Sequence, residues 1–120
     1  MEINQDELQL IADAREVRIV TRGGGRSYRT VIWVVVDQGE VFVRSLRGEH
    51  GKWYQRVRED PDVVLEGAGT KVSLRAVPAS DEASVTRTSE ALRRKYGKDK
   101  SLDFMLAPET LATTMRLEPT

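Results

Sequence analysis

The sequence predicts an α+β fold, a small antiparallel β-barrel with flanking helices. Two neighbouring stretches, Thr30–Val36 and Val41–Leu46, are rich in apolar residues and are joined by a tight hairpin turn, Asp37–Glu40. The first stretch is β-branched or aromatic throughout, which predicts a central strand covered on both faces. Adjacent strands with so few polar residues favour a closed or nearly closed barrel. We expect one domain over residues 1–120.

The overall composition disfavours several classes of protein. The 19 basic and 19 acidic side chains balance, so no net field attracts nucleic acid or an anionic membrane. The absence of cysteine excludes disulfides, thiol catalysis and thiolate metal sites. Val31–Val36 is the longest apolar run and is too short to span a bilayer, and the acidic start Met1–Glu7 is unlike a signal peptide. We therefore expect a cytoplasmic protein without a membrane partner.

The N-terminal segment has the pattern of a capped helix followed by a strand. Asn4 is placed to cap a helix that ends near Ala14, because Glu7 follows three residues later and completes a capping box. Alternation of apolar and polar residues predicts a strand over Glu16–Thr21. The glycines of residues 23–27 predict a flexible turn after it.

The C-terminal half is expected to combine helices with further antiparallel strands, about six strands in all. A helix that starts after Gly51 carries Trp53 and Val57 on one face and ends at Pro61. The remaining expected segments are a hairpin of Asp62–Glu66 and Lys71–Val77, a helix capped by Ser80 and ended by Gly97 with a buried stripe of Val85, Ser89, Leu92 and Tyr96, an apolar plug at residues 104–106 and a last strand at Thr113–Glu118.

A basic turn follows the second apolar strand. Its polar residues are Arg44, Ser45, Arg47, Gly48 and Lys52, which lie where the strand gives way to a helix. A helix start offers unpaired N–H groups and a partial positive charge, so cations, a hydroxyl and a glycine there form a chemically sensible seat for a phosphate. The alternative is a solvated turn rich in arginine and lysine.

A second basic turn surrounds the triple glycine and carries Arg22, Arg26 and Arg29. If the two apolar strands pair, Arg29 lies at the same edge as the end of the second strand, and both basic turns line one mouth of the barrel. Glu49 is the one acid that accompanies these cations. Charge for solubility alone would give the same pattern.

No set of residues predicts catalysis by side chains or metal binding. His50 is the only histidine, and beside Glu49 at a helix start it is expected to be solvated or to cap the helix. One histidine without cysteine disfavours a transition-metal site, and no serine has a nucleophile-elbow context. Trp33 in a buried strand and Trp53 on an apolar helix face leave no exposed aromatic residues for nucleic acid, so we expect no nucleic-acid partner.

The order and spacing of three motifs resemble a known superfamily. They are Arg22–Asp37 (RGGGRSYRTVIWVVVD), Val41–Tyr54 (VFVRSLRGEHGKWY) and Asp60–Leu65 (DPDVVL). Together they are similar to the flavin-binding split β-barrel superfamily, of the pyridoxamine-phosphate-oxidase-like type, and within it to the deazaflavin-dependent nitroreductase branch. The whole chain also resembles a family of small uncharacterised bacterial proteins of this fold.

The resemblance implies a split barrel that forms a homodimer and holds FMN or a deazaflavin (coenzyme F-420) near the subunit interface. It places Ser45, Arg47 and Gly48 in the phosphate-binding turn with Lys52 nearby. Arg29 and Thr30 match the ring edge, Arg26 the basic loop, and Trp53 packing or the cofactor wall. Arg44, from the same basic turn, is also expected to bind the cofactor. Because the cofactor ring carries the hydride, the chain needs no catalytic residue of its own. The implied function is an oxidoreductase acting on a small organic substrate; the alternative is a non-catalytic module that binds the cofactor or another ligand.

Overall fold

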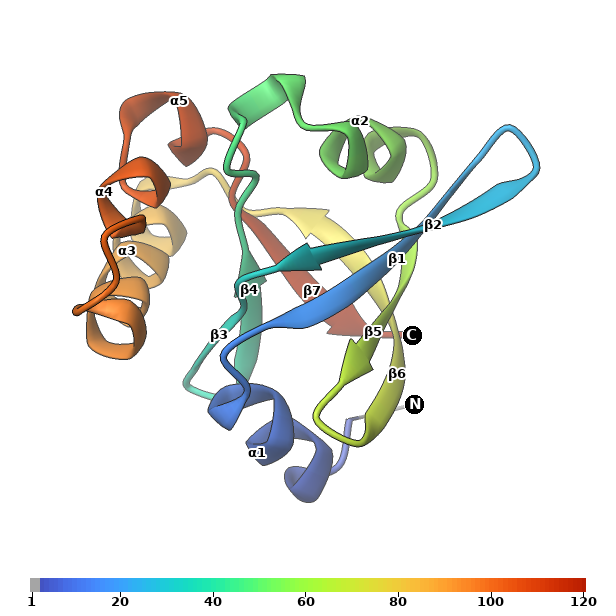
Figure 1. Ribbon diagram of the computed structural model, residues 1–120, viewed down its shortest axis with the longest axis horizontal. Coiled ribbons are helices and arrows are strands. Elements are labelled where there is room, and N and C mark those ends of the chain that lie inside the picture. The colour runs from blue at the N-terminus through green and yellow to red at the C-terminus, as the bar shows by residue number, and fades with distance from the viewer. Residues whose placement is uncertain (1–2) are drawn as a thin grey trace.

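The computed structural model describes residues 3–120, so Met1 and Glu2 of the acidic N-terminal stretch lie outside the described residues. Seven antiparallel strands form one curled sheet in the order β2-β1-β5-β6-β7-β4-β3 (Figure 1). The strands are β1 (Val17–Gly23), β2 (Arg26–Ile32), β3 (Val35–Asp37), β4 (Glu40–Val43), β5 (Asp62–Gly67), β6 (Thr70–Pro78) and β7 (Met115–Pro119). The predicted α+β fold with a small antiparallel split β-barrel is confirmed. Its sheet is a curled half-barrel, with seven strands among the described residues where about six were expected.

Helices lie at both ends of the sheet and along one side of it (Figure 1). They are α1 (Gln5–Asp13), the short 3-10 helix η1 (Gly48–His50), α2 (Lys52–Glu59), α3 (Glu82–Tyr96), α4 (Leu102–Met105) and α5 (Pro108–Leu111). The capping box of α1 is present, since the Glu7 N–H donates to Asn4 Oδ1 and Glu7 Oε1 accepts from the Asn4 N–H. Ile11 of α1 and Val57 of α2 are fully buried in the barrel core.

The stretch Thr30–Val36 does not form the single central strand that was predicted. Its first part continues β2, which pairs with β1, whereas Val35 begins β3, which pairs with β4. β2 and β3 are the two end strands of the sheet, and most of β2 is exposed. The composition of Thr30–Val36 is that of a strand throughout. The chain nevertheless leaves the sheet at the end of β2, one edge strand, and re-enters it as β3, the edge strand on the other side.

The crossing is made at Trp33 and Val34, where the backbone bonds to side chains of α3 rather than to a strand. The Val34 N–H donates to the Tyr96 hydroxyl at 3.3 Å, and the Val34 carbonyl accepts from Lys95 Nζ at 2.6 Å. These partners satisfy a buried backbone unit that has left the sheet. The break is therefore produced by long-range contacts.

The predicted hairpin after Pro61 is confirmed, and the helix that follows it is corrected in detail. Asp81, not Ser80, caps α3, because its carboxylate accepts from the Ser84 N–H. The buried stripe is accordingly rotated by about one residue, and Val85 and Ser89 are only half-buried; its members are Ser84, Thr88, Ala91, Leu92 and Tyr96. This stripe covers the outer face of β3 and β4, where Phe42 forms a second core.

The predicted apolar plug is only partly correct. Met105 is buried in the second core, whereas Phe104 is 65% exposed because α4 turns it toward solvent. Among the helices of residues 3–120, none has the length and apolar character needed to cross a membrane.

Candidate functional site

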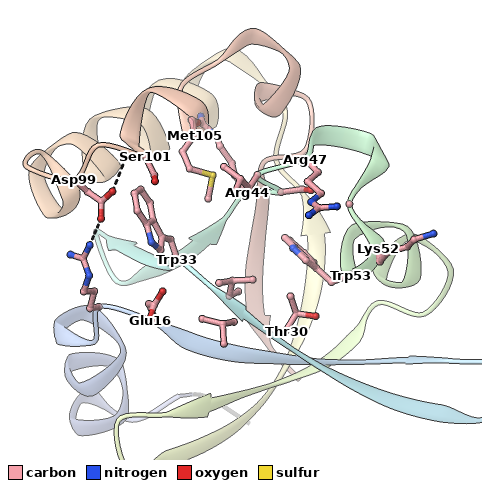
Figure 2. A pocket seen from close by; sticks show the side chains of 16 residues that line it. Glu16, Thr30, Trp33, Arg44, Arg47, Lys52, Trp53, Asp99, Ser101 and Met105 are labelled. Carbon is pink, nitrogen blue, oxygen red and sulfur yellow. Dashed lines mark hydrogen bonds and ion pairs between the residues drawn. The ribbon is translucent and has the colours of Figure 1, made fainter.

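A cavity of about 530 Å³ lies beside β2, between the turn after β4, the start of α2 and the link from α3 to α4 (Figure 2). This volume is within the range of small-molecule sites. The structure brings six of the predicted residues to its wall: Thr30, Arg44, Ser45, Arg47, Lys52 and Trp53.

The Ser45 hydroxyl is the one buried polar group of this wall that has no hydrogen-bond partner among the described residues. Its residue is 1% exposed, and its backbone N–H is fixed by Thr113 Oγ1 at 3.1 Å. A Cβ at Gly51 would lie 2.1 Å from Ser45 Oγ, so glycine is needed there for the hydroxyl to keep its place. A buried, unpaired hydroxyl costs free energy unless a ligand or water completes it.

The start of α2 lies beside this hydroxyl and is positively polarised. Gly51 is its N-cap and offers no side-chain acceptor to the first N–H groups of the helix. Arg47 and Lys52 line the same end of the cavity, and both side chains are exposed without an ion pair among residues 3–120. A free helix start, two unpaired cations and a hydroxyl form an arrangement that favours an anion.

Arg44 also lies in this wall but is fully buried, which distinguishes it from Arg47. Its guanidinium donates to Thr114 Oγ1 at 2.8 Å, to the Met105 carbonyl at 3.1 Å and to the Val85 carbonyl at 2.8 Å. Burial, together with the nearby Arg93 charge, lowers the pKa of Arg44 to about 10. No carboxylate among the described residues pairs with it, so Arg44 ties three segments together and leaves a positive charge beneath the cavity.

Three predicted residues do not line the cavity. Arg29 pairs with Glu66 at 2.8 Å, and Arg26 lies near the tip of the β1–β2 hairpin, which projects from the body of the molecule (Figure 1). Gly48 is buried under Glu109. The two basic turns therefore do not share one mouth, and Arg29 has an acid partner from β5 that its sequence neighbourhood did not reveal.

Trp33 is a wall residue that the sequence reasoning placed in a buried strand. It is half-buried, lines the cavity and stacks on Tyr96 with ring centroids 4.0 Å apart and planes at 5°. The Tyr96 hydroxyl donates to the Arg15 carbonyl at 2.6 Å, and this bond fixes the Tyr96 ring beneath the indole. The indole is thus a rigid platform on the side of the cavity away from Arg47 and Lys52 (Figure 2).

The end of the cavity opposite Arg47 carries acidic groups, also missed from the sequence (Figure 2). Asp99 pairs with Arg15, and the Ser101 N–H donates to its Oδ1 at 2.7 Å. That backbone bond, with help from Arg15, lowers the pKa of the Asp99 carboxyl. Glu16 lies beside the pair and has no hydrogen bond or ion pair with any of residues 3–120.

Lys95, whose amine bonds to the Val34 carbonyl at the crossing, gives a prediction for how stability depends on pH. Burial lowers the pKa of its amine to about 8 from 10.5. Between these values the unfolded chain binds more protons, so the free energy of unfolding rises with pH through this window, and the charged amine costs stability below it. Between pH 7 and 10 the free energy of unfolding of wild type should rise by about 1–2 kcal/mol relative to that of Lys95→Met. This figure is reduced because the Lys95 side chain is partly exposed. Urea titrations at both pH values check this, and a constant difference would contradict it.

The fold is a split β-barrel like that of pyridoxamine 5′-phosphate oxidase-like proteins. The chain belongs to the DUF2255 family, described as an uncharacterized protein conserved in bacteria, whose model matches residues 7–117. No curated protein matches it.

Solved structures share this fold at low sequence identity. An FAD-binding protein from Mycobacterium smegmatis is 21% identical with a TM-score of 0.66, over 98% of this chain and 92% of that one. A pyridoxamine 5′-phosphate oxidase-like protein from Listeria innocua is 15% identical with a TM-score of 0.69, over 95% and 90%. The haem storage protein HutZ from Vibrio cholerae is 10% identical with a TM-score of 0.66, over 100% and 92%. Identities this low establish the shared fold alone.

Proposed function

We propose that this protein binds a flavin-type cofactor in the cavity and uses it as an oxidoreductase. The observation that carries the proposal is the Ser45 hydroxyl, which is buried, unpaired among the described residues and next to the free start of α2. The cofactor phosphate would be held there by Ser45, Arg47 and Lys52, with the buried charge of Arg44 behind them. Gly51 leaves the space that the hydroxyl occupies.

The planar ring would lie next to the phosphate, against β2. Thr30 and its neighbours in β2 form one side, and the indole of Trp53 provides apolar surface (Figure 2). When bound, FMN or a deazaflavin such as coenzyme F-420 supplies hydride or electron transfer through its ring, and the chain binds, orients and desolvates it. The similar structure from M. smegmatis is that of an FAD-binding protein, which supports a flavin-type ligand.

Titration with FMN and with coenzyme F-420 tests the proposal, and Arg47→Ala is its first variant. Arg47 is exposed and unpaired in the described residues, so its loss should leave the fold intact and remove one charge-assisted contact to phosphate. We expect binding to weaken by about 1–3 kcal/mol, read from the visible absorption and fluorescence of the cofactor.

Arg22→Ala is the matched control. Arg22 is also exposed and has no ion pair among residues 3–120, but it lies on the β1–β2 hairpin and is not part of the cavity wall. Its loss should change affinity by less than about twofold. If neither cofactor binds at tens of micromolar, or if both variants behave alike, the phosphate site is not where we place it.

A non-catalytic binding module is the second candidate function. The cavity wall contains neither histidine nor cysteine, so binding without turnover is compatible with its chemistry. A stopped-flow assay with a reductant and a panel of quinones and nitro compounds separates the two. Reduction of an acceptor by the loaded protein supports the oxidoreductase, and binding without any reduction supports the module.

The proposal includes a homodimer that works in the cytoplasm. Val31 and Leu46 line the cavity and are 56% and 52% exposed, which leaves apolar surface at its rim. A second copy of the chain packed there would cover this surface and close the site. A molar mass in solution twice that of the chain would support the dimer.

A further inference from the structure

We infer that the Trp33 end of the cavity binds a planar, positively charged ring, as the second ligand beside the phosphate-bearing cofactor. The inference rests on the proposed function for the role of the cavity, and it adds the chemical class of the substrate. It depends on how charge is distributed along the wall. Arg47 and Lys52 lie at one end, and Glu16 and Asp99 at the other (Figure 2).

Of the charged residues that line this end of the cavity, Glu16 and Asp99 are acidic and Arg15 is basic; Lys95 lies outside the lining, with its Nζ 5.3 Å from the centroid of the Tyr96 ring. Arg15 is committed to Asp99, whose other contact is the Ser101 N–H. Glu16 has no partner among residues 3–120 and adjoins this pair on the same wall. A second anionic group would be repelled there, whereas a cation would be attracted.

Trp33 supplies the surface that selects a ring. Tyr96 covers one face of the indole in a parallel stack, and the residue lines the cavity, so its other face is left for a ligand. Indole attracts a cation over its face more strongly than other aromatic side chains do. An aromatic cation combines this attraction with stacking, and its charge also meets Glu16.

The arrangement also explains why the two ligands would not compete. The start of α2, Ser45 and Arg47 favour an anion, and the unpaired Glu16 disfavours one. A phosphate-bearing ring and a cationic ring thus take opposite ends of one cavity. A cationic substrate placed in this way lies next to the ring that would exchange hydride with it.

N1-methylnicotinamide and nicotinamide form a suitable probe pair, because they have nearly the same planar shape and differ by one fixed positive charge. The chain has 2 tryptophans, so in the Trp53→Phe protein the fluorescence of Trp33 reports binding directly. We expect the cation to quench it with an affinity about three- to tenfold higher than that of the neutral ring.

Glu16→Gln in the same background should reduce that ratio by at least about threefold, and Glu16→Lys should remove the preference. Glu90→Gln is the control, since Glu90 is exposed on α3 and does not line the cavity. Equal affinities for the two probes, no binding of either, or a ratio unchanged by Glu16→Gln would overturn the inference.

FMN titrations of wild type and of Glu16→Gln, both with Trp53 retained, separate this inference from the proposed function. If Glu16→Gln binds FMN as wild type does and, in the Trp53→Phe background, loses the charge preference, both stand. If FMN binds and the ratio is insensitive to Glu16, the inference fails and the cofactor site stands. If FMN does not bind but the probes still discriminate through Glu16, the cofactor proposal fails and the cationic subsite stands.

Discussion

Replacing Arg44 by methionine is expected to lower the free energy of unfolding by about 2–4 kcal/mol. The guanidinium is buried and donates to Thr114 Oγ1 and to the carbonyls of Met105 and Val85. Methionine fills much of the volume but donates to none of these acceptors. The relief of a buried, unpaired charge offsets part of the loss, which keeps the expected cost below the sum of the separate contacts. Urea denaturation at neutral pH measures it.

Arg47→Ala is the control for this variant, because the two arginines are neighbours in one turn with opposite environments. Arg47 is exposed, so its loss should change stability by less than about 0.5 kcal/mol while it weakens cofactor binding. Arg44→Met should lower the free energy of unfolding by much more than Arg47→Ala does. If Arg44→Met is as stable as wild type, the three hydrogen bonds contribute no net stability, and the wall of the cavity is held by apolar packing instead.

The parts of the fold that the sequence predicted are those with local causes. The capping box at Asn4 and Glu7 needs only residues three apart, and the structure contains it. The hairpin of β5 and β6 follows from alternation, with Val72, Leu74 and Ala76 buried on one face as expected. Such features are encoded within a few residues, so they can be derived without the rest of the chain.

The parts that were wrong or missed depend on partners far along the chain. The Thr30–Val36 stretch breaks because Val34 bonds to Lys95 and Tyr96, more than sixty residues later. Trp33 becomes a cavity wall for the same reason, and Arg29 finds Glu66 on β5.

One missed assignment had a signal in the sequence. Phe42 and Val43 are adjacent and apolar, which indicates that both faces of their strand are covered. Arg44 falls on the same face as Phe42 by alternation, and it is therefore buried where Arg47, beyond the strand, is exposed. The sequence could thus have separated the structural arginine from the one available to a ligand.

Gly48→Ala is expected to cost about 2–4 kcal/mol of stability and to weaken cofactor binding as well. Gly48 has φ +61°, which costs an alanine about 1 kcal/mol, and an added Cβ would lie 2.7 Å from the backbone oxygen of Glu109. Since that oxygen belongs to α5, either the helix or the turn must move. The same segment fixes Ser45 through Thr113, so a shift there displaces the hydroxyl that faces the proposed phosphate.

Gly24→Ala isolates the conformational part of this cost. Gly24 has nearly the same backbone conformation, φ +57°, but an added Cβ meets no atom within 4 Å. Its loss should cost only about 1 kcal/mol and leave FMN titrations unchanged, because the β1–β2 hairpin tip is remote from the cavity. Equal stabilities for the two variants would show that α5 yields to the methyl group freely. In that case the contact with Glu109 does not position the phosphate turn, and the tight packing of Gly51 against Ser45 must do so alone.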